Sequence, residues 1–424
     1  MEGALKNGSL LVSDSGNRYK VIRLLGAGGQ GEVYEVERGI ERAALKWYFP
    51  KMATPTQRKI LENIISKSAP DESFLWPEDM LSQNTGGSLG YVMKLRPAEY
   101  KGIVDMMKRR AEPSFAVLSK AAFNLTRGYQ KLHSLGYSYH DISYGNVFLD
   151  PENGNVLICD NDNVSASGND DSSVLGTPRF MAPEIVIGMA SPSRNTDLFS
   201  LSVLLFIMFM LHHPLEGKRE ADIKCMDIHA MTFLFGTNPI FIFDPNDDSN
   251  RPVKGYQDYP LAYWDLYPLF LKDLFTTAFT VGLKHPNRRI TENQWLDALS
   301  NLLSQIVICP KCGSEVFFGV NNCWACGLII PEPPMLKIER RKIALTPDSV
   351  LYSHHIHGDY DHNTIVGSVV RNPSSPSVLG IRNDTANPWT YTKADGTRLP
   401  IAPGKSAAIA NGVKLDFGQT IGEV

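Results

Sequence analysis

The sequence lacks several features that would restrict the class of protein. Its 45 acidic and 42 basic residues leave a formal charge of only −3, so no excess of one sign points to nucleic acid or an anionic membrane as the main partner. The longest apolar run, Leu198 to Leu211, contains serines and is too short to span a bilayer, which indicates a buried helix. The first residues lack the basic and apolar regions of a signal peptide. We therefore expect a cytoplasmic location.

Cysteine is scarce, and its spacing argues against a disulfide framework. Four of the six cysteines form two C-x-x-C pairs, Cys309/Cys312 and Cys323/Cys326, each followed by a glycine that allows a tight turn. This spacing is typical of a tetrahedral Cys₄ zinc site. We expect structural Zn²⁺ in a small ribbon, in preference to two disulfides or a redox pair.

At 424 residues the chain is too long for one ordinary core, so several parts are expected. A strand-rich region precedes a mainly helical one, which predicts the α+β class. Short alternating strands separated by Gly, Pro and Asn turns follow the cysteines. The predicted parts are a flexible lead-in (1–17), an α+β domain (18–303), a zinc ribbon (305–330), a linker (331–340) and an all-β module (341–424).

Three polar residues near the middle of the chain have the order, and nearly the spacing, that phosphoryl transfer from ATP requires. Asp141 and Asn146 lie on a predicted loop, and Asp160 ends an apolar, strand-like run. One carboxylate can orient the attacking hydroxyl, while an Asn and a second Asp can hold Mg²⁺ (or Mn²⁺) against the phosphates. We therefore predict Asp141 as the catalytic carboxylate and Asn146 and Asp160 as the magnesium ligands.

A glycine-rich segment predicts the phosphate-binding part of the same site. Gly26, Gly28, Gly31 and Val33 match the pattern G-x-G-x-x-G-x-V. A dinucleotide-binding turn would open a helix, but residues 32–36 alternate like a strand. We therefore expect a hairpin lid whose backbone N–H groups approach phosphates.

The next predicted strand supplies a cation for this site. Lys46, two residues after Ala44, is predicted to hold the α- and β-phosphates and needs an acid to orient it. A helical pattern over residues 56–67 contains Glu62, which we predict as that acid.

Together these segments resemble a eukaryotic-type Ser/Thr protein kinase domain over residues 19–303. Four further segments carry the resemblance: Leu132–Tyr137, Gly176–Glu184, Asp197–Leu201 and Pro286–Arg289. The resemblance implies a bilobal fold, with a β-rich lobe before an α-rich lobe, that binds ATP and a protein substrate. It also implies that Asp197 fixes the catalytic-loop backbone, that Arg289 pairs with Glu184 and that Thr177 bonds Asp141. In the adenine site it implies Met93 as the gatekeeper and Leu95 in the hinge.

The sequence departs from the kinase pattern at three points. Tyr139-His140 replaces His-Arg, so the arginine that usually receives an activating phosphate is absent. Ser143 replaces a lysine, a loss that typically lowers the rate by about 10²–10³. Asn161-Asp162 replaces Phe-Gly, and Asp162 is a candidate for a metal ligand or a turn cap. A nucleotide-binding pseudokinase scaffold is therefore an alternative, whereas residues 176–184 argue against a small-molecule phosphotransferase.

The C-terminal region offers two weaker patterns. Residues 379–418 resemble the later half of a forkhead-associated (FHA) β-sandwich, either a phosphothreonine reader or a protein-binding variant. The whole architecture resembles bacterial kinases of tellurite-resistance-associated clusters, which implies a phosphatase or a von Willebrand-type protein as partner. The histidine-rich run over residues 354–362 is compatible with a second metal site, but its Gly-Asp sequence favours an exposed loop.

Overall fold

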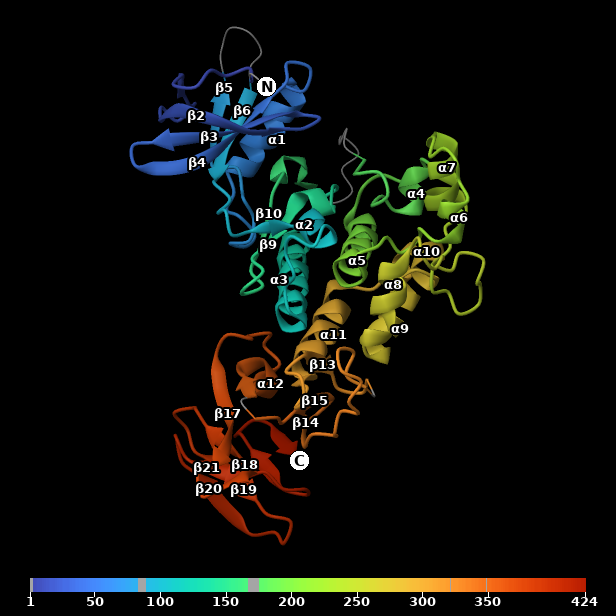
Figure 1. Ribbon diagram of the computed structural model, residues 1–424. Helices are drawn as coiled ribbons and strands as arrows, with labels where there is room; N and C mark the ends of the chain where they lie inside the picture. Colours follow the sequence, from blue (N-terminus) through green and yellow to red (C-terminus); the bar gives the residue numbers. More distant parts are fainter. Residues whose placement is uncertain (1–2, 83–88, 167–174, 321, 348) are drawn as a thin grey trace. The chain divides into compact units, whose positions relative to one another are not determined.

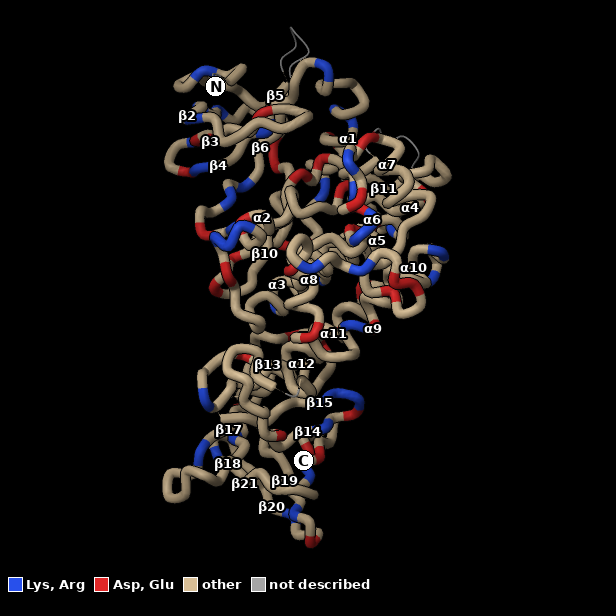
Figure 2. The backbone as a smooth tube through the Cα atoms, turned by 45° about the vertical axis from the view of Figure 1, so that its right-hand side comes forward, with Lys and Arg blue, Asp and Glu red and all other residues tan. Residues whose placement is uncertain are grey.

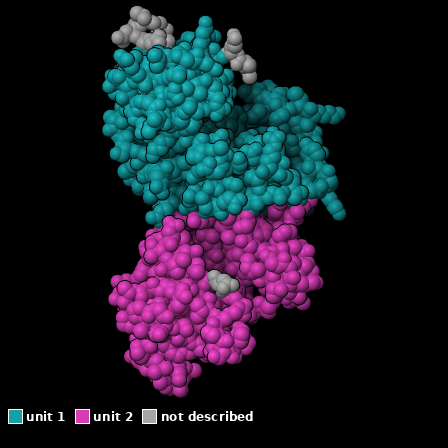
Figure 3. All heavy atoms as spheres, turned by 60° about the vertical axis from the view of Figure 1, so that its left-hand side comes forward, with its two compact units in different colours: residues 1–113, 124–260, 275–292 teal, residues 114–123, 261–274, 293–424 magenta. Residues whose placement is uncertain are grey.

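The computed structural model describes residues 3–82, 89–166, 175–320, 322–347 and 349–424 (Figure 1). The chain divides into two compact units, shown in Figure 3. Unit 1 comprises residues 1–113, 124–260 and 275–292, and unit 2 comprises residues 114–123, 261–274 and 293–424. The domain boundaries predicted from the sequence remain a prediction, because a division by compactness need not follow them. The predicted flexible lead-in and linker are not wholly irregular, since they contain the paired strands β1 (Leu10–Val12) and β14 (Met335–Ile338).

Unit 1 begins with a six-stranded antiparallel sheet in the order β1-β2-β3-β4-β6-β5. Its strands are β1 (Leu10–Val12), β2 (Arg18–Ala27), β3 (Gly31–Arg38), β4 (Glu41–Tyr48), β5 (Asp79–Ser82) and β6 (Leu89–Lys94). The β2–β3 pair confirms the predicted hairpin around the glycine-rich segment. Alternation along the strands gives the sheet two apolar faces, and Leu45 and Ala44 lie in different core clusters.

Helix α1 (Pro55–Ile65) lies against this sheet (Figure 1). The Thr54 hydroxyl accepts the Gln57 N–H, and Pro55 occupies the first turn, where its missing N–H costs no helical bond. Leu61 and Ile64 are the buried positions of the helix. The helical pattern predicted over residues 56–67 is thus confirmed, with its apolar face toward the core.

The following part of the chain is mainly helical, as the α+β pattern predicts. Its helices are α2 (Ile103–Met107), α3 (Phe115–Ser134), α4 (Pro183–Val186), α5 (Arg194–Met210), α6 (Lys218–Ala221), α7 (Ile228–Thr232), α8 (Asp258–Tyr263), α9 (Leu269–Ala278), α10 (Val281–Lys284) and α11 (Glu292–Ser304). Short strands β7 (Lys101–Gly102), β8 (Tyr137–Ser138), β9 (Val147–Leu149), β10 (Val156–Ile158) and β11 (Ser165–Ala166) lie between them. Single turns are η1 (Tyr144–Asn146), η2 (Asn161–Asn163), η3 (Phe233–Thr237), η4 (Trp264–Leu266) and η5 (Pro286–Arg288).

Helix α5 confirms the prediction that residues 198–211 form a buried helix. Its residues from Thr196 to Met210 are buried in the protein. None of the helices in the described ranges has the length and apolar character needed to cross a membrane. Basic and acidic residues intermingle along the backbone (Figure 2), which agrees with the small net charge.

The cysteine segment in unit 2 forms a small hairpin. Strands β12 (Ile306–Ile308) and β13 (Glu315–Phe317) pair antiparallel. The ring of Phe317 packs against Phe115 and Tyr267, with centroids 5.1 and 5.2 Å away. The Glu315 carboxylate accepts the Ala116 N–H at 2.9 Å. The hairpin is therefore attached to helical segments of unit 2 by apolar and polar contacts.

The C-terminal region is an all-β module, as predicted, and its strands form two sheets around one core. The first sheet has the order β15-β14-β23-β22-β19-β20 and the second β16-β17-β18-β21. Both contribute to a cluster that includes Leu336, Ile381, Trp389 and Leu415. The strands are β14 (Met335–Ile338), β15 (Arg341–Ala344), β16 (Val350–Tyr352), β17 (Ile365–Asn372), β18 (Ser375–Asn383), β19 (Trp389–Thr392), β20 (Arg398–Ile401), β21 (Ser406–Ala408), β22 (Lys414–Asp416) and β23 (Ile421–Glu423).

The histidine-rich run does not form the exposed loop that its sequence favours. It includes helix α12 (Ser353–His357), and His354, His355 and His362 are buried. The ring nitrogens of His355 bond to the Tyr352 N–H and the Ser304 hydroxyl. The exposure prediction was wrong because serine and backbone groups satisfy these rings inside unit 2.

Candidate active site

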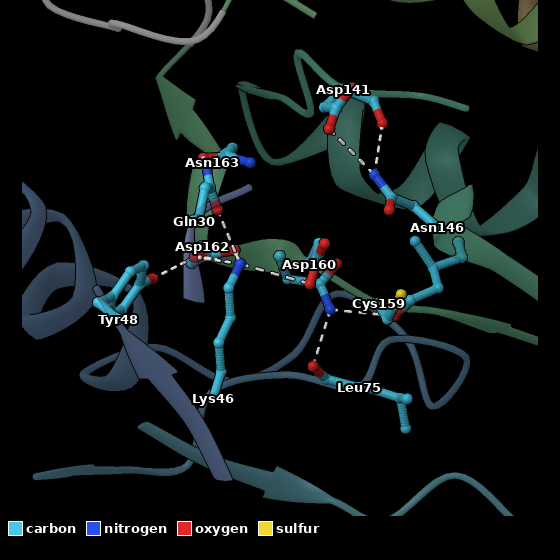
Figure 4. Close-up of polar contacts among 12 residues, drawn as sticks. Gln30, Lys46, Tyr48, Leu75, Asp141, Asn146, Cys159, Asp160, Asp162 and Asn163 are labelled. Atoms are coloured by element: carbon cyan, nitrogen blue, oxygen red, sulfur yellow. Dashed lines mark hydrogen bonds and ion pairs between the residues drawn. The ribbon is translucent and has the colours of Figure 1, made fainter. Parts of the chain in front are cut away.

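Lys46 lies on the inner face of β4, and strand geometry explains its direction. Ala44, Lys46 and Tyr48 alternate onto one face of the strand, whereas Leu45 and Trp47 enter the core on the other. The Lys46 side chain is only 5% exposed. Figure 4 shows its ammonium surrounded by oxygen atoms of three residues from two parts of the chain.

Two carboxylates and one amide contact the Lys46 ammonium. Nζ lies 2.9 Å from Oδ2 of Asp162, 3.4 Å from Oδ1 of Asp160 and 2.8 Å from Oε1 of Gln30. Burial lowers the pKa of Lys46, but Asp162 and Asp160 outweigh it, so the pKa is raised. Burial also raises the pKa of Asp160. The positive charge of Lys46 lowers this pKa, and the negative charge of Asp162 raises it further, so that the net shift is upward. Lys46 is therefore a fixed cation, and Asp160 is a carboxylate with excess negative charge beside it.

The prediction that Glu62 orients Lys46 is wrong in this structure. Glu62 is exposed and pairs with Arg58 one helical turn away, at 2.9 Å. Leu61 and Ile64 turn the opposite side of α1 toward the core. Gln57 shares that inner side, because positions i, i+4 and i+7 of a helix lie on one face. This spacing was visible in the sequence and would have selected Gln57 over Glu62.

Asp162 is the acid that contacts Lys46 most closely, a role that the sequence did not predict for it. It is completely buried, and its carboxylate accepts the Tyr48 hydroxyl as well as Lys46. Gln57 Nε2 donates to the Tyr48 oxygen at 3.2 Å and to the Asp162 backbone oxygen at 3.1 Å. Burial and the Asp162 charge raise the pKa of Tyr48, so this phenol remains a hydrogen-bond donor. No local sequence signal links Asp162 to Lys46, 116 residues away.

The catalytic-loop residues predicted from the sequence lie together. Asn146 Nδ2 donates to the Asp141 backbone oxygen at 2.9 Å and to its Oδ2 at 3.2 Å. The Thr177 hydroxyl donates to Asp141 Oδ1 at 2.6 Å, as the family resemblance implied. Both Asp141 oxygens are thus oriented by neighbouring polar groups. Figure 4 shows the contacts with Asn146.

Asp197 fixes the backbone of this loop, as predicted. Its two carboxylate oxygens accept the N–H groups of Tyr139 at 2.6 Å and His140 at 3.0 Å. His140 has φ of 71°, a left-handed conformation that an ordinary side chain rarely adopts. Burial lowers the pKa of His140, so the ring is neutral near neutral pH and does not replace the missing arginine.

Asn161, which replaces the usual Phe, has a polar anchoring role. Its Nδ2 donates to the backbone oxygens of Leu75 at 2.8 Å and Ile158 at 3.0 Å. Asp160, just before it, has φ of 54° in the left-handed region. The amide bonds therefore tie down a strained turn at the point where Asp160 leaves the core.

The glycine-rich segment forms the β2–β3 turn. The Gly28 N–H donates to the Gly31 carbonyl at 2.9 Å. A Cβ at Gly31 would lie 2.2 Å from the Trp47 carbonyl, so the protein itself requires glycine there. At Gly26 and Gly28 a Cβ would meet nothing within 4 Å, which leaves space over the backbone.

The apolar residues predicted for the adenine site gather in one cluster. Ala44 and Met93 are buried there and are partners across β4 and β6. Val33 and Leu95 pack against them, together with Leu157 and Cys159. The sequence did not predict that Leu157 joins this cluster, because a single apolar residue on a short strand has no distinctive pattern.

A buried ion pair stabilises the end of the segment 176–184. Arg289 Nη1 and Nη2 each lie 2.7 Å from an oxygen of Glu184. This confirms the pairing that the resemblance implied. A two-bond guanidinium–carboxylate pair is geometrically specific, so it fixes the segment that precedes α4.

The four cysteines of unit 2 form the predicted cluster. Sγ of Cys309 lies 3.7 Å from that of Cys326, and Sγ of Cys312 lies 3.5 Å from that of Cys323. All four sulfur atoms lie within 4.8 Å of one another. A tetrahedral zinc ion with Zn–S bonds of about 2.3 Å separates its sulfurs by about 3.8 Å, which fits this arrangement.

Comparison with known proteins gives one family. The family model described as "Protein kinase domain" matches residues 19–297. A probable cell cycle serine/threonine-protein kinase CDC5 homolog from Encephalitozoon cuniculi is 28% identical over 228 residues, 52% of this chain and 47% of that protein. Protein kinase YegI from Escherichia coli is 22% identical over 346 residues, 76% of this chain and 51% of its own length.

One further curated protein and one solved structure are also similar to this chain. The DNA damage-responsive serine/threonine-protein kinase RqkA from Deinococcus radiodurans is 26% identical over 233 residues, 53% of this chain and 34% of that protein. The PknI kinase domain from Mycobacterium tuberculosis is 19% identical with a TM-score of 0.46, covering 70% of this chain and 98% of that one. The chain spans about half, or less, of the length of the curated relatives it matches.

Proposed function

The chain belongs to the protein kinase family, and from this we propose that it transfers the γ-phosphate of ATP to serine or threonine of a protein substrate. The observation that carries the proposal is the contact of Asn146 and Thr177 with the same Asp141 carboxylate. A carboxylate oriented in this way can position the substrate hydroxyl for attack. Thr177 supports Ser/Thr specificity by family resemblance.

The donor set also fits a divalent cation, with Mg²⁺ or Mn²⁺ as the candidates. The Asp160 side chain is 37% exposed and carries excess negative charge beside Lys46 and Asp162. The Asn146 amide nitrogen faces Asp141, which directs its oxygen elsewhere as a second ligand atom. These hard oxygen ligands suit Mg²⁺, which would neutralise phosphate charge when bound. Lys46 would contact the phosphates, and Val33, Ala44, Met93 and Leu95 the adenine.

The buried Ser143 in place of a lysine leaves two candidates, a slow kinase and a pseudokinase scaffold. Since all four of Lys46, Asp141, Asn146 and Asp160 are present, we propose an active enzyme. A labelled-ATP transfer assay with Mg²⁺ or Mn²⁺ tests this on the full chain. Label that disappears in Asp141→Ala and Lys46→Ala supports a kinase. Absence of label in the wild type, with ATP still raising the melting temperature, would indicate a scaffold.

For the cysteine cluster we propose structural Zn²⁺, with no open coordination position. Metal binding would then supply folding free energy on the order of 10–16 kcal/mol. Native mass spectrometry should find one zinc per chain, lost in Cys309→Ser and kept in Cys225→Ser, whose cysteine is exposed outside the cluster. A metal-free chain whose mass reveals disulfides would contradict the assignment.

The C-terminal β module is proposed to recruit a substrate or partner. Its resemblance to FHA domains leaves phosphothreonine reading and other protein binding as two forms of this role. A phosphatase or a von Willebrand-type protein is the partner that the architecture implies. Pull-down with the full chain, with and without prior phosphatase treatment of the prey, separates the two forms.

A further inference from the structure

We propose that Asp162 is the residue that positions Lys46 for nucleotide, in place of an acid from α1. The inference rests on the proposed function and deepens it, because it assigns the counter-ion of the phosphate-binding lysine. Asp162 does not touch the nucleotide in this role. It acts through Lys46 and is therefore a positioning residue.

The distances and burial separate the two acids beside Lys46. Asp162 receives Lys46 on both carboxylate oxygens, at 3.2 and 2.9 Å, and its side chain is completely buried. Asp160 is farther away, at 3.4 Å, and 37% exposed. Since electrostatic attraction is strongest where water is excluded, Asp162 dominates the orientation of the ammonium. Asp160 remains available to a metal ion.

The contacts of Asp162 argue against two other roles, that of a metal ligand and that of a turn cap. A magnesium ligand needs an accessible oxygen, but these oxygens are directed at Lys46 and the Tyr48 hydroxyl inside the protein. A turn cap would bond a nearby backbone N–H, but the Asp162 carboxylate accepts the β4 side chains of Lys46 and Tyr48. Its surroundings are those of a counter-ion.

Helix α1 takes part through a neutral amide. Gln57 bonds the Tyr48 oxygen and the Asp162 backbone, while Glu62 lies on the exposed side with Arg58. A charge on α1 is therefore not needed to orient Lys46. This predicts that Glu62 can be neutralised without loss of nucleotide binding.

A double-mutant cycle tests the assignment by ATP titration calorimetry and by transfer kinetics. Asp162→Asn should lower ATP affinity and kcat/KM by about 10–100-fold, as loss of a group that orients a ligand does. The double variant with Lys46→Met should be no worse than Lys46→Met alone, because one interaction is lost in both. Glu62→Gln is the matched control and should stay near wild type. Full additivity, or an equal loss in Glu62→Gln, would overturn the proposal.

The Michaelis constants provide a readout that loosened packing would not separate. The groups facing Lys46 are Asp160, Asp162, Tyr48 and Gln30. Because Asp162 acts only through the contact of Lys46 with nucleotide, Asp162→Asn should raise the KM for ATP and leave the KM for the protein substrate near that of wild type. An unchanged KM for ATP contradicts the proposal.

A second variant and the behaviour of the wild-type protein keep the test of Asp162 interpretable. If Asp162→Asn does not fold, as judged by its melting curve, Tyr48→Phe removes one bond to the carboxylate and should weaken ATP binding about 10-fold; unchanged binding overturns the proposal. Wild-type protein that binds ATP but transfers no phosphate refutes the proposed function alone, because the binding cycle still tests Asp162. Wild-type protein that binds no ATP refutes both.

Discussion

Unit 1 contains two clusters of buried ion pairs that differ in their net charge. The Lys46 cluster consists of Lys46, Asp160 and Asp162, and the Asp197 cluster of His133, Asp197, Arg194 and Glu292. With His133 protonated, the Asp197 cluster has two positive and two negative charges and is neutral. The Lys46 cluster has one positive and two negative charges, so one negative charge remains.

The remaining charge explains why only one cluster suits ligand binding. In the Asp197 cluster, Asp197 and Glu292 contact opposite nitrogens of the His133 ring, and all three side chains are almost completely buried. In the Lys46 cluster, Asp160 is partly exposed and its pKa is raised mainly by burial. A saturated cluster stabilises the fold, whereas an unsaturated one favours a cation from solution.

The largest effect is expected from removing the unmatched negative charge of the Lys46 cluster at Asp160. Asp160→Asn should lower phosphate transfer by at least about 10³-fold, because the amide is a weaker magnesium ligand. Its melting temperature should stay equal or rise, since the cost of burying the Asp160 charge, the main cause of its raised pKa, disappears together with the lost Lys46 contact. Transfer kinetics and thermal denaturation measure the two effects. Asp265→Asn, at an 84% exposed side chain, is the control. A strongly destabilised Asp160→Asn would show that both clusters are structural.

Neutralising the saturated cluster should have the opposite pattern. Glu292→Gln leaves buried His133 with one acid fewer, so the free energy of unfolding should fall by about 3 kcal/mol. ATP affinity of the folded fraction should change little, because Glu292 does not contact the Lys46 cluster in the described contacts. Urea denaturation followed by ATP titration measures both. Intact stability would remove the distinction between the clusters.

The residues that define each cluster differ in how far the sequence predicts them. Asp141, Asn146 and Asp160 lie within 20 residues and keep the order that the chemistry needs, so local spacing identified them. The Lys46–Asp162 and His133–Glu292 contacts join positions 116 and 159 residues apart. Such contacts depend on how strands and helices pack, which a single sequence does not encode locally.

The same contrast appears in the fold. The hairpin around the glycines, the buried helix α5 and the all-β character of the C-terminal module followed from periodicity and turn residues, whereas its division into two sheets did not. The Glu62 prediction was wrong because it rested on a place within the helix, and Glu62 lies on the face opposite the buried Leu61 and Ile64. The histidine run was wrong because local Gly-Asp turn chemistry says nothing of serines that approach from α11.

The pH dependence of stability should report the Asp197 cluster. Its acids raise the pKa of His133 to about 9 despite burial, and His133 and Arg194 lower that of Glu292 to about 2 despite burial. The His133 contribution, up to about 3 kcal/mol, is complete below its unfolded pKa of about 6.5 and is lost as pH rises through 9. The Glu292 contribution is present above about pH 4.5 and is lost as pH falls toward 2.

Unfolding by urea between pH 6 and 9.5 measures the alkaline loss. Wild type should lose more stability over this range than His133→Gln, which cannot release the proton. Parallel curves for the two proteins would mean that His133 is neutral in the folded state. The cluster would then carry a net negative charge, and its contrast with the Lys46 cluster would fail.

The smallest expected effect lies where the Asp197 cluster meets solvent. Arg194 donates to both oxygens of Glu292, at 3.1 and 2.6 Å, but its side chain is 49% exposed. Water can replace much of what the guanidinium provides, so Arg194→Gln should cost only about 1 kcal/mol of unfolding free energy. The comparison with Glu292→Gln matters because both variants remove the same ion pair. If their costs by urea denaturation are equal, the pair itself stabilises the protein; if Glu292→Gln costs more, the larger part comes from the buried His133 contact, as burial predicts.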